Sequence, residues 1–102
     1  YNYSDKYYSL KFDHIDLFSS FSFPIICKTE SIHKEVVEAC RDIIEVRPIV
    51  AGNIAKQPFL KKYVASEVSL PNADIIHNQG LYFGNDPEAT EEQLKQAIHV
   101  FN

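Results

Sequence analysis

The chain has 102 residues, 45% of them hydrophobic, and a formal net charge of −4 at pH 7. This length suits one domain with a single core, and the acidic balance argues against a nucleic-acid-binding protein, which needs a basic face. No apolar run approaches the ~20 residues of a membrane span, the N-terminal sequence lacks the apolar core of a secretory signal, and two cysteines are too few for a disulfide framework. We therefore expect a reduced cytoplasmic setting with neither nucleic-acid nor membrane partners.

Residues 1–20 are predicted to be an irregular lead-in or linker, because they show neither helical nor strand periodicity. This segment holds six of the chain's 13 aromatic residues, at positions Tyr1, Tyr3, Tyr7, Tyr8, Phe12 and Phe18. Two interpretations stay open: the segment packs on its own domain, or it is a linker whose rings belong against a domain outside the chain. The tyrosine-rich start and the absence of methionine favour a piece cut from a longer protein.

The first strand is predicted over residues 21–28, "FSFPIICK", which are rich in aromatic and β-branched side chains. Pro24 cannot donate to a ladder, so we expect that this strand lies at a sheet edge or that its pairing begins late. A helix follows over residues 31–44, where apolar side chains recur with helical spacing. Ser31 is its expected N-cap.

The second strand is predicted over residues 45–50, "EVRPIV", and it ends at Gly52 and Asn53. The sequence "IAKQPFLKKY" then favours a short helix or turn interrupted by Pro58.

The last third of the chain is predicted to hold a short helix, a short strand and a long helix. Asn72 is the expected N-cap of the short helix and Gly80 its end. The third strand covers residues 81–84, and the final helix covers residues 90–101. The final helix should open with a capping box, and Leu94, Ala97, Ile98 and Phe101 share one apolar face.

This order of elements predicts an α+β fold over residues 21–102. We expect a two-layer small domain, with a sheet of about three strands and two long helices on one of its faces.

The sequence contains no complete active site of a known kind. The four histidines and two cysteines lack metal-ligand spacing, and neither a GxSxG elbow nor a glycine-rich phosphate loop is present. No lysine lies in an apolar pattern that would suit Schiff-base chemistry. We therefore predict no metal site and no catalytic residue within the chain.

Two polar turns directly after strands, "RPIVAGN" and "GLYFGND", are the candidate binding loops. Arg47 suits bidentate recognition of carboxylate or phosphate, asparagines donate and accept, and Gly52 and Gly84 permit a positive φ or close backbone approach. The predicted substrate-binding residues are Arg47, Asn53, His77, Asn78 and Asn85, and we expect neighbouring strands to bring their turns together. The competing interpretations are that both are plain turns and that Arg47 forms an ion pair with Glu45 or Asp42.

The runs "RPIVAGNIAKQPF" and "LPNADIIHNQGLYFGN", followed by a helix that begins with "TEEQL", resemble the C-terminal end of the DegT/DnrJ/StrS family. These are pyridoxal-phosphate-dependent sugar aminotransferases and dehydratases with the aspartate-aminotransferase fold. The resemblance covers about residues 18–102. The glycine usual in the turn before the second strand is absent from "RDIIEVRP", and the family's large domain is absent from the chain.

The resemblance implies that residues 21–102 are the small C-terminal domain of a homodimeric enzyme of fold type I. The large domain, which is a missing partner of this chain, would supply the Schiff-base lysine and hold pyridoxal phosphate, so no cofactor is expected on this chain alone. This domain would cover one side of a cleft that binds a nucleotide-linked sugar and an amino donor for surface-polysaccharide biosynthesis. Transamination and dehydration both stay open, and the alternative is a free-standing ligand-binding or regulatory α+β module.

A severed domain should keep an apolar face where its partner lay. We therefore expect exposed or self-associating rings among Tyr3, Tyr7, Tyr8, Phe12, Phe18, Phe59 and Tyr63.

Overall fold

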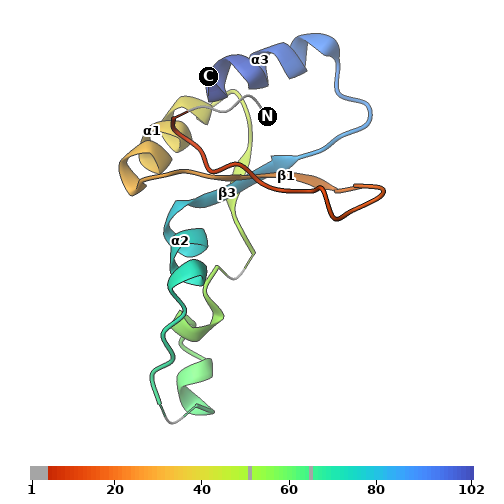
Figure 1. The fold of residues 1–102 in the computed structure, drawn as a ribbon. Coiled ribbons are helices and arrows are strands. Elements are labelled where there is room, and N and C mark those ends of the chain that lie inside the picture. The colour runs from red at the N-terminus through yellow and green to blue at the C-terminus, as the bar shows by residue number, and fades with distance from the viewer. Residues whose placement is uncertain (1–4, 51, 65) are drawn as a thin grey trace.

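The computed structural model describes residues 5–50, 52–64 and 66–102, so the predictions for Tyr1 and Tyr3 lie outside the described residues. The described part has the predicted α+β fold (Figure 1). In chain order the elements are β1 (Ser22–Ile26), α1 (Glu30–Cys40), β2 (Val46–Pro48), the short 3-10 helices η1 (Ile54–Lys56) and η2 (Leu60–Lys62), α2 (Pro71–Gln79), β3 (Gly80–Gly84) and α3 (Glu91–Phe101).

The sheet has three strands in the order β1-β3-β2, and both pairings are antiparallel. The strands β1 and β2 therefore run parallel to each other with β3 between them, while α1 makes the connection from β1 to β2. The edge position that Pro24 predicts for β1 is confirmed.

The core lies between one face of the sheet and the helices α1 and α3, which are on the same side of it (Figure 1). Directly opposed residues of antiparallel strands share a face, so Ile25 and Leu81 point the same way. The buried apolar core consists of Ile25, Cys27, Val36, Cys40 and Leu81. This is a small core, and its members among the described residues come from β1, β3, α1 and the residue that follows β1.

Stacked aromatic rings join α3 to the sheet. Phe83 of β3 stacks on Phe23 of β1 and on Phe101 of α3, with ring centroids 5.1 Å apart in both pairs. The predicted capping box at the start of α3 is confirmed. Its predicted apolar face is only partly used, because Leu94 and Ile98 are exposed while the last turn makes the contact.

The bounds of α1 differ from the prediction at both ends. Thr29, not Ser31, is the N-cap, and its hydroxyl accepts from the backbone N–H of Ile32. The helix ends at Cys40 instead of residue 44, because the chain turns through Asp42, which has a φ of 65°. A left-handed residue breaks the helical path, and Asp tolerates it better than most residues.

The start of α2 also differs from the prediction. Pro71 occupies the first turn and Leu70 is the N-cap, so Asn72 lies inside the helix. Proline suits this position because the first N–H groups of a helix have no intrahelical partner. The predicted end at Gly80 is confirmed, and the chain passes there directly into β3.

The first described residues of the lead-in pair with residues at the end of β1. Tyr7 forms an isolated antiparallel bridge with Cys27, and Tyr8 donates its N–H to the carbonyl of Ile26 at 2.9 Å. Tyr7 is half-buried against the core, whereas Leu17 and Phe18 are exposed. The segment thus packs on its own domain near Tyr7 and presents apolar side chains to the outside further along.

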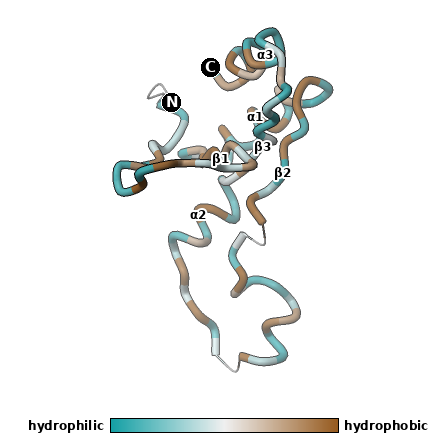
Figure 2. The backbone as a smooth tube through the Cα atoms, turned by 90° about the vertical axis from the view of Figure 1, so that its right-hand side faces the viewer, coloured by the Kyte–Doolittle hydropathy of each residue, from teal (hydrophilic) through white to brown (hydrophobic). Residues whose placement is uncertain are grey.

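An arm formed by residues 52–64 and 66–70 projects away from the sheet, below α2 in Figure 1 and as a loop in Figure 2. It accounts for the elongated shape, 50 × 34 × 26 Å with a radius of gyration of 15.6 Å, against about 13 Å for a compact chain of this length. The predicted short helix or turn around Pro58 is found as η1 and η2. Within the described residues, no helix is long and apolar enough to span a bilayer.

Candidate functional site

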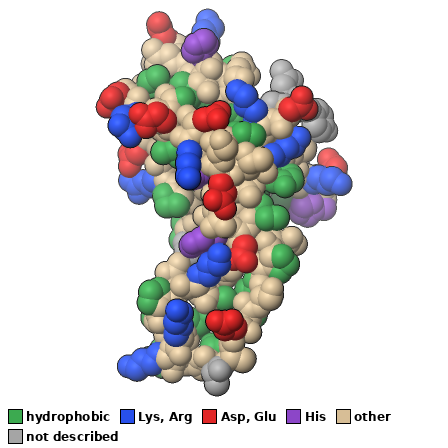
Figure 3. Space-filling model, turned by 90° about the vertical axis from the view of Figure 1, so that its left-hand side faces the viewer, with side chains coloured by type: hydrophobic (Ala, Val, Ile, Leu, Met, Phe, Trp, Pro, Cys, Tyr) green, Lys and Arg blue, Asp and Glu red, His purple; other side chains and the backbone are tan. Residues whose placement is uncertain are grey.

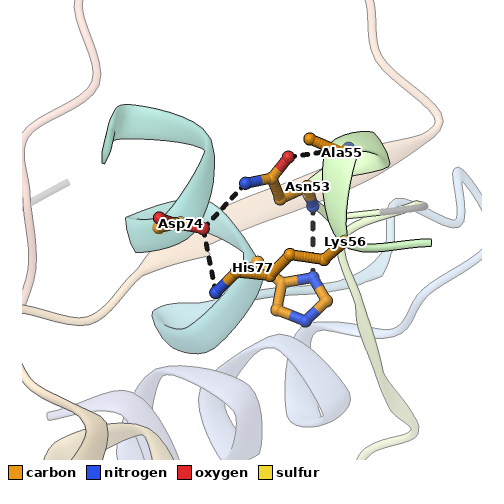
Figure 4. Close-up of polar contacts among 5 residues, drawn as sticks. All are labelled: Asn53, Ala55, Lys56, Asp74 and His77. Carbon is orange, nitrogen blue, oxygen red and sulfur yellow. Dashed lines mark hydrogen bonds and ion pairs between the residues drawn. The ribbon is translucent and has the colours of Figure 1, made fainter. Parts of the chain in front are cut away.

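Where the arm meets α2, four polar side chains and one backbone N–H form a connected group that we call the Asn53 cluster: Asn53, Lys56, Asp74 and His77, with the N–H of Ala55 (Figure 4). Asn53 is 2% exposed and is the one buried polar residue among those described. Its side-chain oxygen accepts from the N–H of Ala55 at 2.9 Å, which caps η1, and its amide nitrogen donates to Asp74 at 2.7 Å. Asn53 therefore fastens the arm to α2.

His77 is oriented by the turn that precedes Asn53. Its ring Nδ1 accepts the backbone N–H of Asn53 at 3.1 Å, so Nδ1 carries no proton and the ring proton of the neutral side chain is on Nε2. Gly52 has a φ of 51°, and a Cβ there would collide with the His77 ring. The positive φ and close approach predicted for Gly52 are both confirmed. His77 itself is exposed, so its Nε2–H can donate to a group outside the chain.

Asp74 links Asn53 to a lysine of the arm. Lys56 lies 2.9 Å from the Asp74 carboxylate, and both side chains are partly exposed. Hydrogen bonds from Lys56 and Asn53, with the charge of Lys56, lower the pKa of Asp74 below its ordinary value. The carboxylate is therefore held ionised at the junction of the arm and α2.

Arg47 lies away from the Asn53 cluster, in the short strand β2. It pairs with Tyr82 in the register, on the face of the sheet opposite Leu81. Its guanidinium donates to Glu45 at 3.0 and 2.7 Å, and this exposed hydrogen-bonded pair raises the pKa of Arg47. The ion pair with Glu45, which was a competing interpretation of Arg47, is thus present in the structure.

Asn85 lies at the far end of β3 from the Asn53 cluster. Its amide nitrogen donates to the carbonyl of Ser20 at 2.8 Å, which fastens the lead-in to the sheet. The expectation that the turns after β2 and β3 come together is wrong, because the two strands are antiparallel and the end of β2 lies beside the start of β3. The expectation of a positive φ or a close backbone approach at Gly84 is also wrong. Its φ is not positive, and a Cβ there would meet no atom.

The five predicted residues therefore occupy three places. Asn53 and His77 are in contact, and Asn78 is exposed beside His77 at the end of α2. Arg47 lies on a sheet face, and Asn85 lies at the opposite end of β3. The Asn53 cluster joins several polar groups from distant parts of the chain.

Sequence analysis missed Asp74 and Lys56 as members of this cluster. Asp74 and His77 are three residues apart on one helix, a spacing that puts two side chains on the same face. That spacing was a usable signal in "NADIIHNQG". Lys56 had no comparable signal, because its contact with Asp74 depends on how the arm folds back.

A hollow on the surface near α3 contains none of the predicted residues. It is an open depression of about 680 Å3 between the turn after α1 and α3, lined by Asp42, Ile43, Glu91, Lys95, His99 and Val100 among others. Lys95 is paired with Glu91 at 2.8 Å. Within the described residues, no group of three or more His, Cys, Asp or Glu side chains is arranged to hold a metal ion.

Comparison with known proteins finds two significant relatives, both curated as GDP-4-keto-6-deoxy-D-mannose 3-dehydratase. The protein from Yersinia pseudotuberculosis is 34% identical over an alignment of 92 residues that covers 80% of this chain and 22% of the relative. The protein from Escherichia coli O55:H7 is 39% identical over 72 residues, 66% of this chain and 19% of the relative. No protein-family model and no solved structure matches the chain.

These relatives show homology between this chain and a part of sugar-modifying enzymes. The chain spans about a fifth of the length of the curated relatives that it matches. Both relatives carry the same dehydratase name. Sugar dehydratases are among the enzymes that the sequence motifs resemble.

Proposed function

We propose that this chain is the C-terminal part of a pyridoxal-phosphate-dependent enzyme that removes the 3-hydroxyl group of a nucleotide-linked 4-keto-6-deoxysugar. The similarity to two enzymes that are named for the same activity carries the proposal. It favours dehydration over transamination, which the motifs alone left open. GDP-4-keto-6-deoxy-D-mannose is the substrate to test first. A cytoplasmic homodimeric parent that serves surface-polysaccharide biosynthesis belongs to the same proposal.

The residues of this chain do not by themselves fit pyridoxal phosphate. All eight lysines are exposed, whereas a Schiff-base lysine must be desolvated or placed beside another cation to react as a neutral amine. The open depression beside α3 is lined by the acidic side chains of Asp42 and Glu92, which do not suit a phosphate. The cofactor would therefore be held by parts of the parent enzyme outside this chain.

Within the proposed enzyme, His77 and Asn78 are the residues best placed to contact the nucleotide sugar. The Nε2–H of His77 is a donor whose direction is set by the Asn53 N–H behind the ring, and hydroxyl or phosphate oxygens are its suitable acceptors. Asn53 is buried, so it acts as a positioning residue for His77. Arg47 and Asn85 are exposed and would require separate contacts with the substrate or the large domain.

The experiment is to find the reading frame that contains these residues, express the whole protein, and supply pyridoxal phosphate, an amino donor and GDP-4-keto-6-deoxy-D-mannose. Mass spectrometry of the sugar nucleotide then separates the loss of the 3-hydroxyl group from the gain of an amino group. A 3-deoxy product is expected. An aminated product would overturn the dehydratase assignment, and a natural protein that begins near Tyr1 would favour the free-standing module.

Two substitutions distinguish the roles of the two ring nitrogens of His77. Asparagine reproduces the Nδ1 acceptor and glutamine an outer N–H donor. If Nε2 binds the substrate, His77→Asn raises KM or lowers kcat while Tm stays near wild type, and His77→Gln lowers Tm but keeps more activity. Wild-type Tm and wild-type kinetics in His77→Asn, with impairment only in His77→Gln, would assign His77 a purely structural role.

A further inference from the structure

The arm exposes apolar side chains that nothing within the described residues covers. Of the 16 large hydrophobic residues exposed in the described chain, six lie in the arm: Ile54, Phe59, Tyr63, Val64, Val68 and Leu70. Tyr63 is 76% and Phe59 is 57% exposed. Isolated exposed apolar residues are ordinary, but six within one short projection are the mark of an interaction surface.

The arm also lacks a core of its own. Neither η1 nor η2 contains a buried residue, and the one buried residue in the described part of the arm is the polar Asn53 at its base. Ordering a residue costs about 1–2 kcal/mol of backbone entropy. Apolar burial is the main term that offsets this cost, and the arm obtains very little of it from the rest of this chain.

Charge distinguishes the arm from the rest of the chain. The arm carries three lysines and one glutamate, although the whole chain has a net charge of −4. Figure 3 shows hydrophobic and lysine side chains next to each other on the narrow lower part of the molecule. Two such arms packed against each other would bring like charges together, so a symmetric arm-to-arm dimer is disfavoured.

We propose that the arm is a docking surface for the remainder of the parent polypeptide, and that it packs on an apolar surface with an acidic rim that meets Lys61 and Lys62. This inference rests on the proposed function, since the occupant is chain outside residues 1–102. The relatives supply the supporting observation: this chain matches only 22% and 19% of their lengths. The Asn53 cluster would then hold the arm at a fixed angle to α2, ready for that contact.

The test places a photo-crosslinking residue in the arm of the full-length parent. Tyr63→p-benzoylphenylalanine is irradiated, and the crosslinked peptides are mapped by mass spectrometry. We expect crosslinked species at monomer mass that join the arm to residues outside this chain. Species at dimer mass would assign the arm to a second copy, and an absence of crosslinks or crosslinks only within residues 1–102 would also overturn the proposal.

Charge reversal gives a second, independent measurement. The pair Lys61→Glu and Lys62→Glu should lower Tm of the parent by ~2–4 °C or more, whereas the control pair Lys28→Glu and Lys34→Glu, exposed residues at α1, should not. An equal effect of both pairs would contradict the acidic rim.

The crosslinking outcome is separable from the enzymatic one. An arm that crosslinks to the rest of the parent in a protein that leaves the keto-sugar unchanged would support docking and refute the activity. A reading frame limited to these 102 residues would refute both.

Discussion

Two regions of the molecule are stabilised by different interactions. One is the sheet region, which consists of the sheet, α1 and α3, and the other is the arm. The sheet region gathers all five buried apolar residues of the described chain and stacks aromatic rings on both sides of Phe83. The arm has exposed apolar side chains and is attached through the hydrogen bonds of Asn53. The first region can bury its own apolar surface, whereas the second is shaped for contact with something else.

The largest difference between the two regions should appear on truncating one apolar residue in each. Leu81→Ala, at a residue that is 1% exposed, should lower the free energy of unfolding of the isolated chain by about 2–5 kcal/mol. Phe59→Ala in the arm should change it by no more than about 0.5 kcal/mol, as for surface sites. Urea unfolding measures both. Equal losses would mean that the arm packs on this domain in solution.

The turn at the base of the arm should be the next most sensitive place. Gly52→Ala puts a Cβ into the His77 ring at a left-handed position, and we expect a loss of about 1–3 kcal/mol. Gly84→Ala is the matched control, because its Cβ would meet no atom; there we expect no loss, or a gain of about 0.4–1 kcal/mol from a less flexible unfolded chain. Thermal unfolding distinguishes them, and a harmless Gly52→Ala would contradict the described turn.

Asn53 should have a smaller but distinct effect. Asn53→Ala removes the cap of η1 and the bond to Asp74, and we expect a loss of about 1–2 kcal/mol. Asn78→Ala, an exposed asparagine of α2, should be nearly neutral. Hydrogen exchange should locate the Asn53→Ala effect in the arm and α2. Faster exchange in the sheet alone would argue against the role given to Asn53.

Asp42 offers a test within the sheet region. It holds a φ of 65° in the turn between α1 and β2, the turn where the resembled family usually has glycine. Asp42→Gly should raise stability by about 0.5–1 kcal/mol, because glycine adopts this conformation without a steric penalty. Thermal unfolding measures this as an increase in Tm. An unchanged or lower Tm would show that the greater freedom of the unfolded chain outweighs the loss of the steric penalty at this φ.

The Asp74 contacts should make the attachment of the arm sensitive to acid. The pKa of Asp74 is lower in the folded chain than in the unfolded one because Lys56 and Asn53 donate to it. Its contribution to stability is therefore present above the unfolded value of about 3.9 and is lost as pH falls through the lower folded value. Asp74→Asn should flatten the fall in Tm below about pH 4. An equally steep fall in the variant would exclude Asp74 as its cause.

The sequence by itself determined the kinds and order of the elements, because helical and strand periodicities are local. It predicted the edge position of β1 through Pro24, the capping box of α3 and the positive φ of Gly52. Helix starts were less accurate: Thr29 and Leu70, not Ser31 and Asn72, precede α1 and α2. A polar residue near a helix start acts as a cap only when its own backbone is outside the helical region, as it is at Thr29.

The tertiary structure alone decided which of the candidate residues meet. β3 lies between β1 and β2 and runs antiparallel to both, and this direction puts Asn85 at the end of the sheet opposite Asn53. The burial of Asn53 and the bond from its backbone to His77, 24 residues away, depend on the arm folding back on α2. Local sequence patterns do not encode such a contact, because it forms between segments whose separation in space is set by the whole chain.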